Sequence, residues 1–461
     1  MEMEFEAFGI DDFGPSVRIQ VPSTAEGLAQ FNQAFLDPQQ RAYVQHIDFH
    51  VVLPIISEKR LRKLQSRREA EENDSIFTRA VTAFFGRLAK WERRRYGPGI
   101  TLKIVVQSPT DRLVEEMEED GELTNTHNHR MPPIWQVRDH FHGGPGGRNF
   151  HPDAIAAITS ALSSARTIEW KLRLPTRRLM NARRNIRLAL GNALLKTAFP
   201  SVVEFNVKLD DKDPMDETFD LEKLTSDEGE EDRLSLGIRR ICQLPSLRRL
   251  HLETLWILSP VAFGLHPTLP DIQCPSLEYL YIDCAVTTPG GKYVLTGNPD
   301  KAMVDDGGYG FDHDESITAF DSDDSDTSDF LPDFEWSRLA GDFPGKWFRY
   351  TPDTETFVPL ARSFICAVEK MPALRRLDIH FGGSSKETRA PLDMSYFAPG
   401  EVNRGASHVN GRKAFDEENA NRPRWFLCGG RKFDKQWKMP QQLEREFKGK
   451  SVSGVVHIAT N

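Results

Sequence analysis

The sequence predicts a mixed α/β fold, an irregular leucine-rich-repeat-like solenoid of stacked strand–helix units with acidic disordered insertions. A short phrase with the spacing L-x-x-L-x-L recurs, a proline heads four copies, and helix-forming segments separate several copies. These four copies are FPSVVEFNV at 199–207, LPSLRRLHL at 244–252, CPSLEYLYI at 274–282 and MPALRRLDI at 371–379. An earlier stretch, YVQHIDF at 43–49, keeps the spacing without the proline.

The alternation of large apolar residues within the phrase is typical of a short strand with one buried face. The four prolines, Pro200, Pro245, Pro275 and Pro372, are 45, 30 and 97 residues apart. Regular leucine-rich repeats have a period of about 20–29 residues. The repeats are therefore irregular and carry long insertions. The alternative is an α/β sheet with helices on one face.

Periodicity also predicts the remaining elements. We expect an N-terminal segment, 1–40, and one repeat domain, 41–460, with low-complexity acidic insertions at 210–232 and 300–335. Residues 55–73 are expected to form a solvated loop or a frayed helix. The predicted helices span 25–36, 74–95, 155–165, 181–197, 234–244, 357–370 and 441–447. The further predicted strands span 44–53, 100–108, 167–174, 422–429 and 452–460.

Composition restricts the class of protein. The 461 residues hold no apolar run long enough to span a bilayer and no signal-peptide pattern, so we expect a cytoplasmic or nuclear protein. The five cysteines form no C-x-x-C pair, which indicates neither a disulfide framework nor a zinc knuckle. The net charge of −9 is uneven. Residues 210–232 hold twelve acidic residues and residues 300–335 hold thirteen, so the rest of the chain is basic.

Several clusters could carry chemistry, and each has a plainer reading. His127, His129, His140, His142 and His151, with Asp139 and Asp153, could bind zinc or form a polar surface loop. The run GGPGGR at 143–148 lacks the Lys-Ser/Thr of a P-loop, which favours a flexible connection. The basic run 166–196 is a solvated helix face, a site for an acidic protein or a nucleic-acid site. Ser322, Ser325 and Ser328 lie among aspartates and are candidates for phosphorylation.

The pattern of the phrase selects candidate binding residues. Its aliphatic positions point into the core, so the residues between them point outward. On the outer face Tyr and Arg are the types enriched at interface hot spots. The candidate binding residues are Arg248, Arg249, His251, Glu278, Tyr279, Tyr281, Arg375, Arg376 and Asp378. The double substitution Arg249→Glu and Arg376→Glu is expected to abolish partner capture without changing the melting temperature.

No nucleophile–base motif, metalloprotease motif or kinase signature is present, so we expect a binding protein and not an enzyme. No cofactor and no metal site are predicted. A strand row of this kind is normally used to bind another protein, which makes a protein partner on the concave face the first expectation. No nucleic-acid motif accompanies the basic run, and no membrane partner is predicted.

The order of segments resembles a group of filamentous-fungal F-box proteins and associated leucine-rich-repeat domain proteins. The resembling pieces are YVQHIDFHVVLP, NDSIFTRAVTAFFGRLAKWE, GITLKIVVQSPTD, the glycine-rich text at 143–150, SALSSARTIEWKL, MPALRRLDIHF and RPRWFL. They cover roughly residues 25–430. The resemblance implies an irregular repeat fold that binds a substrate, and an N-terminal F-box that recruits a Skp1-type adaptor and a cullin. Residues 1–40 do not show an F-box.

Three functional hypotheses follow. The first is an adaptor that presents a protein substrate to an F-box-type ubiquitin ligase. The second is a stand-alone repeat scaffold unrelated to ubiquitin. The third is an enzyme with a site that no motif marks.

Overall fold

The computed structural model describes two compact units, Met1–Asn149 and Phe150–Asn461. The described residues are 4–11, 14–55, 67–91, 99–109, 150–175, 177, 180–211, 213–225, 231–264, 269–305, 340–341, 345–382, 392–402, 412–429, 437–448 and 455–460. The division after residue 149 differs from the expected boundary at residue 41. The reason is strand β3, which contains the proline-free phrase and belongs to a sheet of the first unit.

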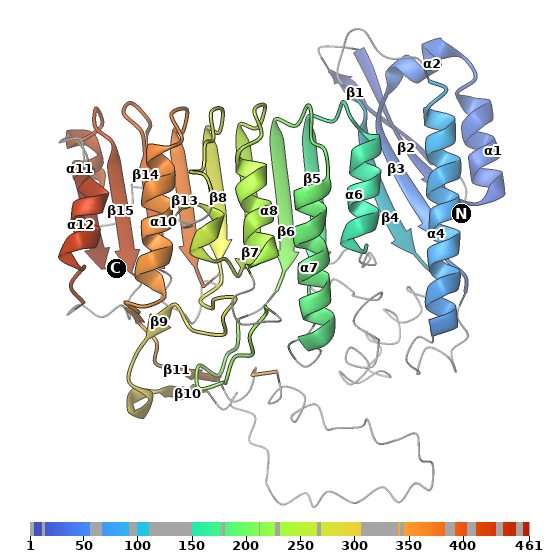
Figure 1. Ribbon diagram of the computed structural model, residues 1–461. Coiled ribbons are helices and arrows are strands. Elements are labelled where there is room, and N and C mark those ends of the chain that lie inside the picture. Colours follow the sequence, from blue (N-terminus) through green and yellow to red (C-terminus); the bar gives the residue numbers. More distant parts are fainter. Residues whose placement is uncertain are drawn as a thin grey trace, which may run out of the picture. The chain divides into compact units, whose positions relative to one another are not determined.

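The first unit is a four-stranded sheet with the order β1-β2-β3-β4. Strands β1 and β2 are antiparallel, whereas β2, β3 and β4 are parallel (Figure 1). The strands are β1 Glu4–Asp11, β2 Gly14–Pro22, β3 Val44–Val52 and β4 Thr101–Gln107, and the helices are α1 Ala25–Ala34, α2 Pro38–Tyr43 and α4 Arg67–Leu88. Helix α4 begins within 55–73, where a solvated loop or a frayed helix was expected.

Aromatic side chains hold the helices of the first unit on its sheet. Phe49 of β3 and Phe84 of α4 are fully buried, and their rings stack with centroids 4.1 Å apart. Phe31 of α1 lies 5.7 Å from Phe84 and 5.4 Å from Trp91, so the two helices share one apolar cluster. Such pairs stabilise by about 0.5–1.5 kcal/mol beyond the burial of their area.

The second unit is built on an eight-stranded sheet with the order β16-β15-β14-β13-β8-β7-β6-β5. Strands β5, β6, β7, β8 and β13 are parallel, and β14 runs antiparallel to both of its neighbours. The predicted α/β class is therefore confirmed, and the structure shows that the sheet is large and mostly parallel. The strands are β5 Thr167–Arg173, β6 Glu204–Asp210, β7 Arg249–Trp256, β8 Tyr279–Cys284, β13 Arg376–Phe381, β14 Leu392–Phe397, β15 Arg424–Gly429 and β16 Val455–Thr460.

Among the described elements, five helices cover one face of this sheet (Figure 1). They are α6 Pro152–Ala161, α7 Met180–Lys196, α8 Arg233–Cys242, α10 Phe357–Glu369 and α12 Gln441–Lys448. Their apolar residues join those of the strands in one core, which includes Leu190, Ile238 and Phe364. Helix α11, Arg412–Glu418, lies on the opposite face, where Phe415 packs against Phe426 and His457.

The four proline-headed phrases form four neighbouring strands, β6, β7, β8 and β13. Their aliphatic positions point into the core as predicted. Leu247, Leu250 and Leu252 of one copy are 0% exposed, as are Leu277 and Ile282 of the next. The phrase therefore identified a set of parallel strands and the face that each of them buries.

The turns that precede these strands repeat one set of hydrogen bonds. The amides of Arg248 and Arg249 donate to the carbonyl of Val203, at 2.8 and 3.1 Å. The amides of Glu278 and Tyr279 donate to Arg248 in the same way, at 2.8 and 2.9 Å. A side-chain bond recurs too, since Ser246 donates to the carbonyl of Pro200 at 3.3 Å. The serine of the second copy and that of the third thus bond their turns to the turn before, since Ser276 donates to the carbonyl of Pro245 in the same way.

Part of the first acidic segment is ordered, contrary to the prediction of a disordered insertion at 210–232. Glu217 is 4% exposed, and its carboxylate accepts hydrogen bonds from the amides of Phe348 and Arg349, at 2.6 and 2.7 Å. The carboxylate of Asp213 accepts from the amide of Val286 at 3.2 Å. Backbone amides of a later segment therefore give these two acidic residues a structural role.

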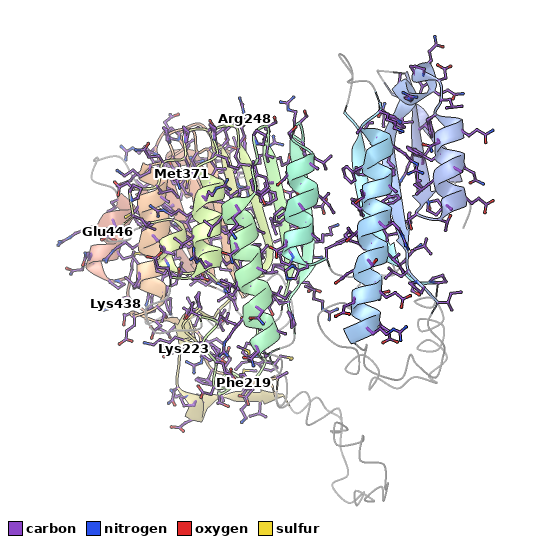
Figure 2. All side chains as sticks on the ribbon, turned by 45° about the vertical axis from the view of Figure 1, so that its right-hand side comes forward. Phe219, Lys223, Arg248, Met371, Lys438 and Glu446 are labelled. Atoms are coloured by element: carbon purple, nitrogen blue, oxygen red, sulfur yellow. The ribbon has the colours of Figure 1, made fainter. Side chains whose placement is uncertain are left out.

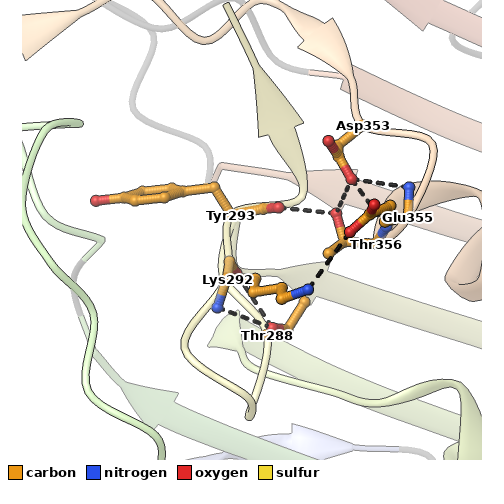
Figure 3. Close-up of polar contacts among 6 residues, drawn as sticks. All are labelled: Thr288, Lys292, Tyr293, Asp353, Glu355 and Thr356. Carbon is orange, nitrogen blue, oxygen red and sulfur yellow. Dashed lines mark hydrogen bonds and ion pairs between the residues drawn. The ribbon is translucent and has the colours of Figure 1, made fainter.

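That later segment forms short elements beside the ends of the parallel strands. They are β9 Leu295–Thr296, η4 Pro299–Lys301, β10 Met303–Asp305, β11 Gly345–Trp347 and β12 Thr351–Pro352. The short helix η3, Pro260–Ala262, comes earlier in the chain, between β7 and β8. Figure 3 shows how they connect to α10, with the hydroxyl of Thr356 donating to the carbonyl of Tyr293 at 2.7 Å and Lys292 pairing with Glu355 at 3.4 Å. Most of the predicted insertion at 300–335, with Ser322, Ser325 and Ser328, lies outside the described residues.

Candidate functional site

The face of the large sheet opposite its five helices carries the candidate site, and we call it the open face. Alternation places every second residue of each strand there, because the residues between them fill the core. Its side chains over the parallel strands are Thr167, Glu169, Lys171, Arg173, Glu204, Asn206, Lys208, Asp210, Arg249, His251, Glu253, Tyr279, Tyr281, Asp283, Arg376, Asp378 and His380. Among the described helices, α11 alone packs on this face, over β14 to β16.

The structure brings the nine predicted binding residues together. Strand register aligns Arg249, Tyr279 and Arg376 in one row across β7, β8 and β13. A second row aligns His251, Tyr281 and Asp378. The other three, Arg248, Glu278 and Arg375, immediately precede the same strands. This position is the edge at which the parallel strands begin, where Figure 2 labels Arg248.

Tyr279 lies between two arginines at this edge. The guanidinium carbon of Arg249 is 5.5 Å from the centroid of the Tyr279 ring, and that of Arg375 is 5.7 Å from it. Both arginine side chains are 55% exposed. Each cation–π contact of an exposed arginine contributes about 0.5–1 kcal/mol. We call Arg249, Tyr279 and Arg375 the arginine–tyrosine cluster.

Each arginine of the set also has a carboxylate partner. Arg248 pairs with Glu278 at 2.8 Å, Arg249 lies 3.7 Å from Glu204, and Arg375 pairs with Glu401 at 2.9 Å. A guanidinium has five donors, so these single contacts leave donors for a ligand. These pairs orient the arginines without satisfying every donor.

Asp378 does not fit the expectation of an outward contact residue. It is 9% exposed and accepts a hydrogen bond from Arg376 at 2.5 Å. Arg376 also lies 5.3 Å above the ring of Phe397. The double substitution with Arg376→Glu is therefore expected to lower the melting temperature, whereas the proposed test required it to stay unchanged. A carboxylate at position 376 would lie beside the buried Asp378 and lower the stability of the fold.

The sequence reasoning missed a group of side chains farther along the same strands. His380 forms a hydrogen bond of 2.8 Å with Asp393, and the hydroxyl of Tyr281 donates to Asp283 at 2.8 Å. The ring of Tyr281 lies 5.3 Å from that of His380 and 6.0 Å from that of His251. One signal could have found them, since LHLE, YIDC and DIHF each place a polar residue one alternation after the candidates.

These groups shift one another's protonation. Burial raises the pKa of Tyr281, and its hydrogen bond to Asp283 raises it further. Burial alone would lower the pKa of His380. The hydrogen bond to Asp393 and the charges of Asp393, Asp378 and Asp283 outweigh burial, so the pKa of His380 is raised above its ordinary value of 6.5. Three carboxylates, those of Asp393, Asp378 and Asp283, therefore favour the protonated form of His380.

Strand β7 bends where it meets this group. Its register with β8 shifts between Leu252 and Trp256, and Thr254 has φ 61°, in the left-handed region. A β-branched residue with this backbone is strained. The amide of Thr254 donates to the buried carboxylate of Asp283 at 3.1 Å, which holds the bulge in place.

A cavity of about 250 Å³ lies at the other edge, where the parallel strands end. Its lining includes Arg177, Arg183, Phe219 and Glu222, and Figure 2 labels Phe219 on that side. Arg183 donates to Pro175 and pairs with Asp211, so its charge is compensated within the fold. Arg183 is therefore not a candidate for binding a ligand in this cavity.

The basic run 166–196 is not simply a solvated helix face. Arg183 and Arg187 of α7 are 2% and 3% exposed. Arg187 pairs with Asp232 at 2.7 Å and also donates to the carbonyl of Ile257 at 2.6 Å. These two arginines therefore join elements of the core and are not available to a partner.

Of the histidine cluster, His127, His129, His140 and His142 lie outside the described residues, as does 143–148. His151 caps α6, where its Nδ1 accepts from the amide of Asp153 at 3.3 Å. Within the described ranges, no group of three or more His, Cys, Asp and Glu side chains could hold a metal ion. In the same part of the chain, no helix combines the length and the hydropathy that crossing a bilayer requires.

Searches with this chain found no matching family model, no matching curated protein and no matching solved structure. The geometry of the open face and the sequence pattern are therefore the basis for a functional proposal.

Proposed function

We propose that the chain is a non-enzymatic protein-interaction module that binds a partner protein on the open face. The observation that carries this proposal is the arginine–tyrosine cluster. Tyr279 presents an aromatic ring between two half-exposed guanidinium groups, Arg249 and Arg375. Tyr and Arg are the residue types that contribute most to protein interfaces, and they do so when clustered.

The surroundings of the cluster support the same reading. The row formed by Arg249, Tyr279 and Arg376 continues into a second row with two aromatic rings, His251 and Tyr281. Strand pairing fixes the backbone beneath both rows, so their side chains need little ordering when a partner binds. Low ordering cost is one of the conditions for useful affinity at a modest interface.

We also propose that the parallel strands are successive units of an irregular leucine-rich-repeat-like solenoid. The repeated bonds of the proline-headed turns support this, because the same backbone amides and serine hydroxyls are used in successive copies. On this proposal the open face is the concave recognition surface of the repeat array. The sequence resemblance then suggests the substrate-recognition part of an F-box-type ubiquitin ligase adaptor.

The test is quantitative affinity purification of the tagged full chain from its own cells, with mass spectrometry. Wild type is compared with the triple variant Arg249→Ala, Tyr279→Ala, Arg375→Ala. The matched control is Lys292→Ala, which also removes an exposed, ion-paired cation but lies beside α10. We expect a specific partner to be recovered equally by wild type and control, and at least tenfold less by the triple variant.

The identity of the recovered proteins separates the two forms of the proposal. A Skp1-type adaptor and a cullin among them would support the ligase adaptor. Other partners alone would support the stand-alone repeat scaffold. Equal recovery of every specific partner by the triple variant, at an unchanged melting temperature, would rule out binding through the arginine–tyrosine cluster.

A further inference from the structure

The open face changes charge along the direction of its central strands. At the edge where β7, β8 and β13 begin lie four arginines, Arg248, Arg249, Arg375 and Arg376, of which Arg249 and Arg375 contact the ring of Tyr279. Glu278, Glu204 and Glu401 each pair with one of the first three. Toward the other end of the same strands and β14, the side chains are mainly carboxylates. We call Glu253, Asp283 and Asp393 the acidic end. Asp378 lies one row before it, level with His251 and Tyr281.

The acidic end carries an excess of negative charge. Among the described residues of β7, β8, β13 and β14, the cationic groups beside it are Arg376 and His380. Arg376 pairs with Asp378, and His380 pairs with Asp393. Asp283 is 8% exposed and accepts hydrogen bonds from two neutral donors, the amide of Thr254 and the hydroxyl of Tyr281. Glu253 is exposed, and its register partner on β6 is Lys208. The charges of Asp393, Asp378 and Asp283 also raise the pKa of His380.

Aromatic rings occupy the row between the two charged ends. His251 and Tyr281 lie side by side there, with ring planes inclined by 27° and centroids 6.0 Å apart. Along β7 the open-face positions are Arg249, His251 and Glu253, that is, basic, aromatic and acidic. Successive open-face positions are two residues apart, so the three rows span roughly 13 Å.

A peptide bound in an extended conformation has the same spacing of side chains as the rows of the open face. Its side chains on one side recur every second residue, and four residues of extended chain also span roughly 13 Å. A helix rises only about 1.5 Å per residue, so it would need about nine residues to reach both ends. The spacing of the rows therefore matches an extended segment residue by residue.

We propose that the open face binds an extended segment of its partner with the pattern acidic–x–apolar–x–basic, the acidic side chain meeting the arginine–tyrosine cluster and the basic side chain meeting the acidic end. This inference rests on the proposed function and adds the chemistry of the partner. The acidic side chain takes the unused guanidinium donors, the apolar side chain covers the rings of His251 and Tyr281, and the Lys or Arg lies near Glu253.

The test uses a displayed library of random twelve-residue peptides, selected on the immobilised full chain. We expect the pattern acidic–x–apolar–x–basic to be enriched at least tenfold over the unselected library. On Glu253→Gln the preference for Lys or Arg at the last position should fall several-fold, and on Glu253→Lys it should turn toward Asp or Glu. The control Glu355→Lys reverses another exposed negative charge, beside α10, and should select as wild type does.

Three results would overturn the inference. These are no enrichment on wild type, enrichment of peptides without the pattern, and a wild-type preference retained by Glu253→Lys. The proposed function fails separately. A partner whose recovery depends on Arg249, Tyr279 and Arg375, together with a library that lacks the pattern, would keep the binding face and reject only this description of its ligand.

Discussion

The hydroxyl of Ser276 donates a hydrogen bond of 2.6 Å to the carbonyl of Pro245, thirty-one residues earlier in the chain. The two residues occupy neighbouring copies of the same phrase, whose strands β7 and β8 are adjacent. Ser246 bonds Pro200 in the same way. The fourth copy has Ala373 at the serine position and lacks this donor. The serine is thus a stabilising link between copies.

We predict that Ser276→Ala lowers the free energy of unfolding by about 1 kcal/mol, the net value of one such bond. Ala373→Ser should raise it by roughly 0.5–1 kcal/mol, because the new hydroxyl would reach the carbonyl of Pro275. Denaturant unfolding measures both. Ser201→Ala is the matched control, since β5 before it has no proline-headed turn to accept a bond, and it should have little effect. A neutral Ala373→Ser would show that the fourth turn is not equivalent.

Thr254→Gly is predicted to stabilise the protein. Thr254 has φ 61°, a backbone that is costly for a β-branched residue by about 1–3 kcal/mol, whereas glycine adopts it freely. The greater entropy of glycine in the unfolded chain offsets part of the gain, so we expect a net rise of about 1 kcal/mol in the free energy of unfolding. Thr167→Gly, at an open-face position of β5, should instead lower it. A loss of stability in Thr254→Gly would mean that the threonine side chain supports the bulge.

The His380–Asp393 pair should make stability depend on pH. The pKa of His380 in the folded protein lies above its ordinary value of 6.5. Protonated His380 therefore contributes stability that is complete below about pH 6.5 and is lost as the pH rises through the folded-state pKa. The groups that face it are Asp393 of β14, Asp283 and Tyr281 of β8, and Asp378 of its own strand.

We predict that Asp393→Asn lowers the pKa of His380 and destabilises the protein more at pH 5.5 than at pH 9. Titration of the histidine ring by NMR gives the pKa, and urea unfolding at the two pH values gives the stability. Ser395→Ala, two residues along the same strand, should cost the same at both. An equal cost of Asp393→Asn at both pH values would show that the pair contributes no net charge interaction.

Two ion pairs of α7 should differ greatly in their value. Arg187 and Asp232 are 2.7 Å apart with side chains 3% and 6% exposed, whereas Arg184 and Glu222 are 3.1 Å apart and 30% and 60% exposed. Asp232→Asn leaves a buried guanidinium without its counter-charge, and we expect a loss of about 3–5 kcal/mol. Glu222→Gln should cost less than about 1 kcal/mol. Thermal unfolding of both variants measures the difference, and similar losses would contradict the assigned role of burial.

The sequence predicted the parts of the fold that depend on a repeated local pattern. The phrase at 199–207 and its three later copies became β6, β7, β8 and β13, and helical spacing located α7, α8, α10 and α12. Strand β2 was missed although Val17, Ile19 and Val21 alternate. Strand β14 was also missed. Its apolar and polar residues alternate as far as Tyr396, but Phe397 puts an apolar residue at an open-face position, where its ring is buried against Phe426.

The candidate site was predicted only in part, for a physical reason. The alternation of apolar residues along each strand shows which side chains point away from the core, and this pattern located the arginine–tyrosine cluster. Whether an outward residue remains accessible depends on its neighbours on other strands. Asp378 is covered by Arg376 of its own strand, which packs over Phe397 of β14, and His380 is hydrogen-bonded to Asp393 of β14. Such cross-strand partners follow from register, which a single sequence does not specify.

Strands β8 and β13 are hydrogen-bonded neighbours, although the prolines that head their phrases are 97 residues apart. The chain leaves β8 at the edge where the parallel strands end and returns through α10, so the residues inserted between them do not interrupt the ladder. Length can therefore be gained or lost in this excursion without re-registering Tyr281 against Asp378. The segment between β8 and α10 can therefore change in length and sequence while the side chains of the open face keep their positions.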